Sequence, residues 1–156
     1  MQGKGHAVCV GADIDTDLVI AGRYLRTKDH STWVAHIFED LDPLLAGRLN
    51  GAVILAGKNF GCGSSREQAA IAIREAGVVA VVAPSFARIF FRNAINIGLP
   101  LIECELECRE GTMITFDLKE GWVEAYGKKS ITRPLSPKMQ EILAAGGLVN
   151  YWRSYG

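Results

Sequence analysis

The sequence predicts an α/β fold with a mainly parallel central sheet, followed by a C-terminal hairpin and helices. Segments 52–56 and 78–83 are apolar without polar alternation, which is typical of strands buried on both faces. Helical patterns at 65–76 and 84–93 follow these two strands, and a further apolar segment at 98–102 leads back into the sheet. Alternating strands and helices with short connections favour parallel pairing and right-handed crossovers.

The N-terminal third is less regular. Residues 7–10 predict a first strand, and a turn with Asp13, Asp15 and Asp17 follows it. Asp13 and Asp15 are typical of capped polar turns. Three nearby acids also suggest a cation site, but the glycine and the distal glutamate of an EF-hand are missing. Residues 31–49 form only a weak helical pattern, which a proline interrupts.

The C-terminal third has a different pattern. Residues 112–117 and 122–126 alternate polar and apolar side chains around a Lys-Glu-Gly turn, which predicts an antiparallel hairpin, with 130–132 as a further short strand. A serine followed by proline at the first turn predicts a helix over 136–145. Residues 148–155 predict a short terminal helix that covers the sheet or a partner.

Length and composition limit the classes of protein. The 156 residues predict a single domain, 1–156, large enough to bury a core. The 17 basic and 17 acidic residues balance, so nothing indicates a nucleic-acid or membrane-surface protein. No apolar run is long enough to span a bilayer. The polar N-terminus does not resemble a signal peptide, so we expect a cytoplasmic protein.

The cysteine pattern does not predict a metal centre. The four cysteines are Cys9, Cys62, Cys104 and Cys108, and none forms a C-x-x-C pair. With only three scattered histidines, a complete zinc or iron–sulfur ligand set is not visible, so we expect this chain to bind no metal. Disulfides are not expected in a reducing compartment. Most of these thiols are interpreted as small core residues.

A glycine-rich loop at residues 57–67 joins an apolar strand to a helical pattern. It contains three glycines in seven residues and then Ser64, Ser65 and Arg66. Free backbone N–H groups and the positive end of the helix dipole favour an anion here, and a guanidinium suits carboxylate or phosphate. Ser64 with Glu67, or Ser65 one residue later, also has the spacing of a capping box. Capping explains neither the glycines nor the arginine, so a functional loop is favoured.

The motifs resemble a known family. They are Asp13-Ile14-Asp15-Thr16-Asp17, Gly61-Cys62-Gly63-Ser64-Ser65-Arg66-Glu67 and Ala83-Pro84-Ser85-Phe86-Ala87-Arg88-Ile89-Phe90. The chain resembles the small subunits of 3-isopropylmalate dehydratases, which are equivalent to the swivelling fourth domain of aconitase. The likeness runs from about residue 5 to residue 152. It implies an aconitase swivel-domain-like fold and an aconitase-type hydro-lyase of leucine biosynthesis.

The resemblance also implies an active site shared with another chain. In this family a large subunit holds a [4Fe–4S] cluster, which acts as a Lewis acid on the substrate, in a heterodimer or heterotetramer. By resemblance, Ser64 is the catalytic base and Asp17 supports the site. Ser65 and Arg66 bind substrate carboxylate. The reaction is dehydration followed by rehydration with the opposite regiochemistry. Isolated small subunits can also self-associate.

The resemblance leaves two candidate substrates, isopropylmalate and a homoaconitase-type acid. By resemblance, the loop containing Leu25 and Arg26 reaches the variable substituent of the di- or tricarboxylic acid substrate. An apolar loop is expected for isopropylmalate, whereas an arginine suits the extra carboxylate of a homoaconitase substrate such as homocitrate. If Leu25 faces the substrate and Arg26 turns outward to the partner, the loop fits isopropylmalate. We favour isopropylmalate as the substrate.

Two other functional classes compete with this reading. A stand-alone carboxylate- or phosphate-binding module could use the same loop, and it predicts anion binding without a partner. A nucleotide site is less well supported, because residues 57–66 match neither the P-loop pattern nor G-x-G-x-x-G.

Overall fold

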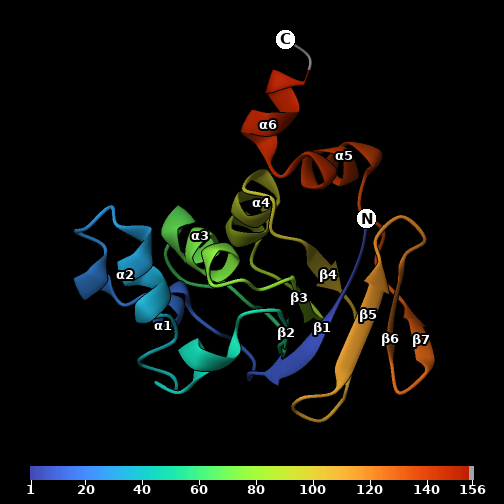
Figure 1. Ribbon diagram of the computed structural model, residues 1–156, viewed down its shortest axis with the longest axis horizontal. Coiled ribbons are helices and arrows are strands. Elements are labelled where there is room, and N and C mark those ends of the chain that lie inside the picture. The colour runs from blue at the N-terminus through green and yellow to red at the C-terminus, as the bar shows by residue number, and fades with distance from the viewer. Residues whose placement is uncertain (155–156) are drawn as a thin grey trace.

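The computed structural model describes residues 1–154 and has a mixed α/β architecture (Figure 1). The strands of this part are β1 (Gln2–Cys9), β2 (Ala52–Leu55), β3 (Ala80–Ala83), β4 (Leu101–Glu103), β5 (Met113–Asp117), β6 (Trp122–Ala125) and β7 (Lys128–Ile131). The α-helices are α1 (Thr16–Val19), α2 (His30–Ala35), α3 (Glu67–Glu75), α4 (Arg88–Asn96), α5 (Pro137–Ala145) and α6 (Leu148–Arg153). Two short 3-10 helices are η1 (Gly22–Tyr24) and η2 (Leu45–Arg48).

All these strands form one sheet in the order β4-β3-β2-β1-β5-β6-β7. The four strands from β4 to β1 pair in parallel, whereas β5, β6 and β7 extend the sheet from β1 by antiparallel pairing. The predicted parallel core and C-terminal hairpin are therefore both confirmed, including the short third strand.

Alternate residues of the parallel strands point into two different cores. Ala52 and Ile54 of β2 pack with the helices α1–α4, whereas Val53 and Leu55 pack with the hairpin strands and α5. The sheet curls around this second core, as Figure 1 shows. The two edge strands, β4 and β7, come close to each other: the N–H of Arg133, just after β7, donates to the carbonyl of Glu103 in β4 at 3.0 Å. Burial on both faces explains the apolar runs of the central strands.

The first strand begins much earlier than the sequence predicts. β1 starts at Gln2 rather than at residue 7, because its first half pairs with β5 while its second half pairs with β2. Its glycines permit close packing: a Cβ at Gly3 would overlap the ring of Phe116, and a Cβ at Gly5 would overlap the carbonyl of Gly51. The polar first residues are thus part of the sheet.

Several helix boundaries differ from the predictions. The weak pattern at 31–49 is a short α2, turns and η2 rather than one helix. The helix predicted from residue 84 begins at Arg88, because Ser85 instead accepts a hydrogen bond from the N–H of Asn59 at 2.8 Å. Ser136 caps α5 as predicted, by accepting from the N–H of Met139 at 3.2 Å.

The terminal helix α6 ends at Arg153. The predicted helix extends to residue 155, and residues 155–156 lie outside the described residues. In Figure 1, α6 follows α5 at the end of the molecule where α4 also lies. Across residues 1–154, no helix is both long and apolar enough to cross a membrane.

Candidate active site

Three loops meet at one edge of the sheet, because β1, β2 and β3 are parallel and end there. The loop after β2 is hydrogen-bonded to the loop after β1: the N–H of Gly61 donates to the carbonyl of Ile14 at 2.8 Å, and the N–H of Thr16 donates to the carbonyl of Cys62 at 2.9 Å. On its other side, the N–H of Ala87 donates to the carbonyl of Phe60 at 2.9 Å. The glycine-rich loop is therefore held between its two neighbours, at the sheet edge where open α/β proteins bind ligands.

Two glycines of this loop are required by close packing and by their backbone conformation. Gly61 and Gly63 have φ values of +86° and +90°, in the left-handed region that glycine adopts most readily. A Cβ at Gly61 would overlap the Phe90 ring, and one at Gly63 would overlap the carboxylate of Asp15. The same Asp15 carboxylate accepts from the N–H of Asp17 at 2.7 Å and so caps α1. The glycines therefore let the acid-rich turn and the serine loop touch.

Neither serine acts as a helix cap. Helix α3 begins at Glu67 with Arg66 as its N-cap, and no side chain makes a capping hydrogen bond there, so the capping-box alternative is wrong. Ser64 and Ser65 are exposed. The carbonyl of Ser64 accepts from the Thr16 hydroxyl at 2.8 Å and from the Arg66 N–H at 2.9 Å. The backbone of Ser64 is thus fixed while its hydroxyl keeps no partner within residues 1–154.

Arg66 and Asp17 form an ion pair across the two loops. Arg66 Nη1 lies 2.6 Å from Asp17 Oδ1, with the Arg66 side chain 24% exposed and the Asp17 side chain 56% exposed. The same nitrogen is shielded from solvent, and in the described part of the chain it has no hydrogen-bond partner. The ion pair and the missing hydrogen bond are compatible, because the two charged groups are close while the N–H bonds of Nη1 are not aligned with the carboxylate. The ion pair with Asp17 therefore fixes the Arg66 guanidinium at the cavity wall.

These residues line a cavity of about 270 Å³. Ser64, Ser65 and Arg66 form one wall, and the first turn of α4, beginning at Arg88, forms another. Thr16 closes the cavity beside the acid-rich turn. The sequence did not indicate Arg88 or Thr16 as site residues, although both lie within the segments 83–90 and 13–17 that carry the family resemblance. Arg88 is exposed, so it adds a second positive charge to the cavity.

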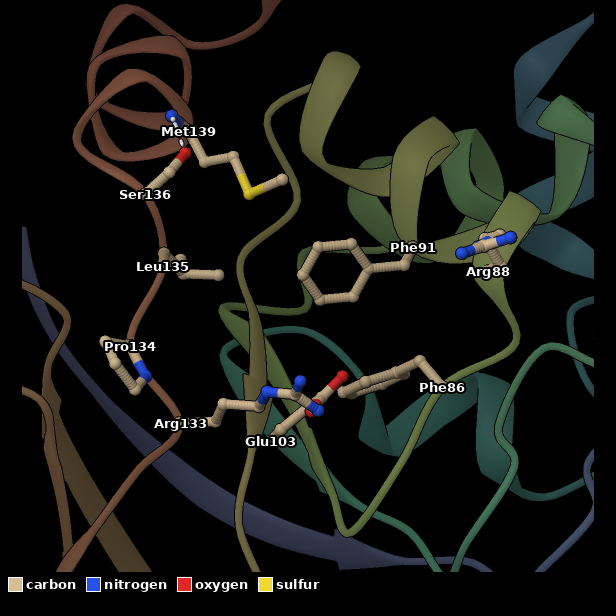
Figure 2. A pocket seen from close by; sticks show the side chains of 9 residues that line it. All are labelled: Phe86, Arg88, Phe91, Glu103, Arg133, Pro134, Leu135, Ser136 and Met139. Atoms are coloured by element: carbon tan, nitrogen blue, oxygen red, sulfur yellow. Dashed lines mark hydrogen bonds and ion pairs between the residues drawn. The ribbon is translucent and has the colours of Figure 1, made fainter.

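A larger cavity of about 390 Å³ lies beside this one and shares only Arg88 with it (Figure 2). Phe86 and Phe91 face Leu135 and Met139 across it, and Arg133 pairs with Glu103 at 3.1 Å on its floor. None of the predicted site residues lines this space. The smaller cavity is the candidate active site because it contains the serines and the arginine.

The predicted substrate loop, residues 24–27, does not line the cavity, although η1, which leads into it, starts near Arg66. A Cβ built on Gly22 would be 3.9 Å from Arg66 Nη1, so η1 starts beside the guanidinium. Leu25 is half-buried against the helix-side core. Arg26 is exposed, with no partner among the described residues. Neither residue therefore lines the cavity, and this segment comes near the site at Gly22.

The cysteines are not fully buried, so their interpretation as core residues is wrong in part. Cys9 is exposed, whereas Cys104 and Cys108 pack half-buried against the second core. Cys62 lies in the site loop, where burial and then the carboxylates of Asp15 and Asp13 raise the pKa of its thiol. The Cys62 thiol is therefore protonated at neutral pH and a poor nucleophile. Within residues 1–154, no group of three or more Cys, His, Asp or Glu could hold a metal ion.

Comparison with known proteins places these features in a family. The family model "Aconitase C-terminal domain" matches residues 11–105, which include all three loops. The "3-isopropylmalate dehydratase small subunit" of Aliarcobacter butzleri is 50% identical over 146 residues, covering 90% of this chain and 88% of the relative. The "Methanogen homoaconitase small subunit" of Methanothermobacter thermautotrophicus is 45% identical over 152 residues, covering 96% of this chain and 89% of the relative.

A solved structure agrees with the sequence relatives. The crystal structure of 3-isopropylmalate dehydratase from Methanocaldococcus jannaschii superposes with a TM-score of 0.94 at 45% identity, covering 99% of this chain and 95% of that one. The expected aconitase swivel-domain-like fold is thereby confirmed, as is the resemblance drawn from the motifs. The chain belongs to the aconitase C-terminal domain family.

Proposed function

We propose that this chain is the small subunit of a 3-isopropylmalate dehydratase, which interconverts 2-isopropylmalate and 3-isopropylmalate by dehydration and rehydration in leucine biosynthesis. The observation that carries the proposal is the cavity in which Ser64, Ser65 and Arg66 meet, with Asp17 paired to the arginine. Relatives of nearly the same length are named as small subunits of this enzyme. A single domain, 1–156, supplies this part of the active site.

Ser64 is proposed to remove and return the proton next to a substrate carboxylate. A serine hydroxyl is a weak base, so its alkoxide needs nearby positive charge and N–H donors. Arg66, Arg88 and the uncapped first turns of α3 and α4 supply both around the cavity. Because Ser64 is exposed here, water would quench an alkoxide, and a covering partner is required to exclude it.

The partner is proposed to be a large subunit with a [4Fe–4S] cluster, in a heterodimer or heterotetramer. When bound, the cluster supplies a Lewis acid for the substrate hydroxyl. The described residues of this chain offer no ligand set for it, which fits a cluster held by the partner. Asp17 is exposed beside Arg66 and can orient a group that the partner contributes.

Ser65 and Arg66 are proposed to hold a substrate carboxylate. The Arg66 guanidinium lines the cavity, and its forked N–H donors suit a carboxylate. Ser65 adds an exposed hydroxyl on the same wall. Together they favour an anionic substrate in this cavity over a neutral one.

A homoaconitase-type acid is the alternative substrate, and one observation favours it. Arg26 is exposed without a partner in the described part of the chain, so it is available to a further carboxylate. One relative is named a homoaconitase small subunit. Leu25, half-buried against the core, still offers apolar surface at the loop.

Arg26→Val is expected to separate these two substrates. If Arg26 meets a third carboxylate, the variant with a cluster-loaded large subunit should lose about tenfold or more in kcat/KM on homoaconitate, with little change on isopropylmalate. Steady-state rates on both acids measure this. Lys28→Val, which removes an exposed cation from the same segment, is the control. An unchanged preference in Arg26→Val would remove this loop from substrate selection.

A stand-alone carboxylate-binding module is the rival from another class. It predicts that the isolated chain binds citrate-like acids tightly and forms no complex with a large subunit. Calorimetric titration of the isolated chain, together with a mass measurement with and without the large subunit, separates the two functions. Self-association of the isolated chain would not by itself describe the working complex.

A further inference from the structure

The carboxylate of Glu39 lies beneath the loop that begins next to Arg66. Glu39 Oε1 accepts from the Tyr24 hydroxyl at 2.7 Å and from Arg23 Nη2 at 3.0 Å. Its other oxygen, Oε2, contacts His36 Nδ1 at 2.5 Å. These contacts, first that from Tyr24 and then those from His36 and Arg23, lower the pKa of Glu39 to about 2. The carboxylate therefore stays ionised and joins two loop residues to the turn after α2.

The rings and the guanidinium around Glu39 strengthen this connection. The Tyr24 ring stacks on His36, with centroids 4.1 Å apart and planes 8° apart, and the Arg23 guanidinium lies 4.9 Å from the Tyr24 centroid. Arg23 also makes two hydrogen bonds to Asp40, at 2.7 and 3.1 Å. The buried Trp33 donates from Nε1 to the Tyr24 carbonyl at 3.1 Å. Tyr24 is thus held by its backbone, its ring face and its hydroxyl.

The backbone that presents Glu39 has an uncommon conformation. Phe38 is fully buried and has a φ of +58°, which is rare for a bulky side chain. Its N–H donates to the carbonyl of Val19 at 2.9 Å, at the end of α1. The left-handed residue turns the chain so that Glu39 points back to the loop. The packing of Phe38 therefore sets the position of the carboxylate.

The residues after Tyr24 make none of the side-chain hydrogen bonds that hold Arg23 and Tyr24 to Glu39. Arg26 is exposed without a partner in residues 1–154, and Leu25 packs only half-buried. The loop is therefore fixed at Arg23 and Tyr24, while the exposed Arg26 side chain beyond them remains available. Such a loop presents side chains to a ligand only as accurately as its anchor holds it.

We propose that Glu39 and His36 are positioning residues, which hold the loop at residues 22–26 so that Leu25 and Arg26 meet the variable substituent of the substrate. The inference rests on the proposed function, because it assigns a role in substrate selection to residues outside the catalytic cavity. Glu39 does not line the catalytic cavity; it acts through Tyr24.

The test uses the chain reconstituted with a wild-type, cluster-loaded large subunit, on isopropylmalate and on homoaconitate. In Glu39→Ala, KM on the preferred acid should rise about tenfold while kcat stays within about threefold, because only substrate positioning is lost. The ratio of kcat/KM values for the two acids should shift about tenfold towards unity. Glu39→Gln, whose amide oxygen still accepts from Tyr24, should recover part of both changes.

Two further variants keep the test decisive. Tyr24→Phe removes only the hydroxyl bond and keeps the ring on His36, so it should show the same trend if Glu39→Ala fails to fold. Glu75→Gln removes an acid that pairs with His30 of α2 at 3.4 Å but does not touch the loop, so it should behave as wild type. Unchanged KM and unchanged preference in folded, active Glu39→Ala or Tyr24→Phe would overturn the positioning role and leave the proposed function standing. A wild-type complex that converts neither acid would overturn the proposed function itself, and the inference with it.

Discussion

Ser64→Ala is expected to reduce turnover by about a thousandfold or more in the complex with the large subunit, because it removes the proposed base. The fold should be unaffected: the Ser64 side chain is exposed and makes no hydrogen bond in the described part of the chain, and only its carbonyl holds the loop. Steady-state rates measure the loss. Circular dichroism and a pull-down of the large subunit check that fold and assembly survive.

Ser65→Ala is the matched control for this experiment, since the two serines are adjacent and both exposed. If Ser65 binds carboxylate rather than moving a proton, its loss should mainly raise KM and leave a measurable kcat. A Ser64→Ala complex with near-normal kcat would remove Ser64 from the mechanism. Equal effects of both substitutions would place the two hydroxyls in the same role.

Gly63→Ala is expected to have the second largest effect, through geometry rather than chemistry. The added Cβ would overlap the Asp15 carboxylate, and φ at this position is +90°. The strain should cost about 1–3 kcal/mol of unfolding free energy. Because Asp15 caps α1 through the Asp17 N–H, its displacement should also move Asp17 away from Arg66. We therefore expect activity to fall about a hundredfold, as small misplacements at active sites do.

Denaturant unfolding and steady-state rates measure the two parts of this prediction. Gly11→Ala is the control, because Gly11 lies in the neighbouring loop and a Cβ there would meet no atom within 4 Å. It should leave stability within about 1 kcal/mol of wild type. If Gly63→Ala is as stable and as active as Gly11→Ala, the contact between the serine loop and the acid-rich turn does not support the site.

The parallel half of the fold was predictable because its strands are buried on both faces. Segments 52–56 and 78–83 show this directly as uninterrupted apolar runs. The start of β1 was not predictable from pattern, since residues 2–6 are polar or glycine and become a strand by antiparallel pairing with β5. Likewise, Pro84-Ser85 is typical of a helix start, but the Ser85 hydroxyl accepts a hydrogen bond from Asn59 of the glycine-rich loop, and α4 begins only at Arg88.

The site was predictable where one loop carries it and not where several loops share it. Ser64, Ser65 and Arg66 stand together in the sequence, so their meeting required no tertiary information. Arg88 reaches the same cavity only because α4 begins beside the serine loop. The link between Glu39 and Tyr24 depends on the turn at Phe38, whose left-handed backbone has no signal in the sequence.

Titration of this chain into a fixed amount of cluster-loaded large subunit tests the central claim most directly. Dehydration of isopropylmalate, followed by the absorbance of the alkene it forms, should be undetectable for this chain alone. The rate should rise with added chain and saturate at a fixed stoichiometric ratio, because each active site needs one copy of the serine loop. Turnover by the isolated, cluster-free chain, or no activation of the large subunit at any ratio, would contradict the account.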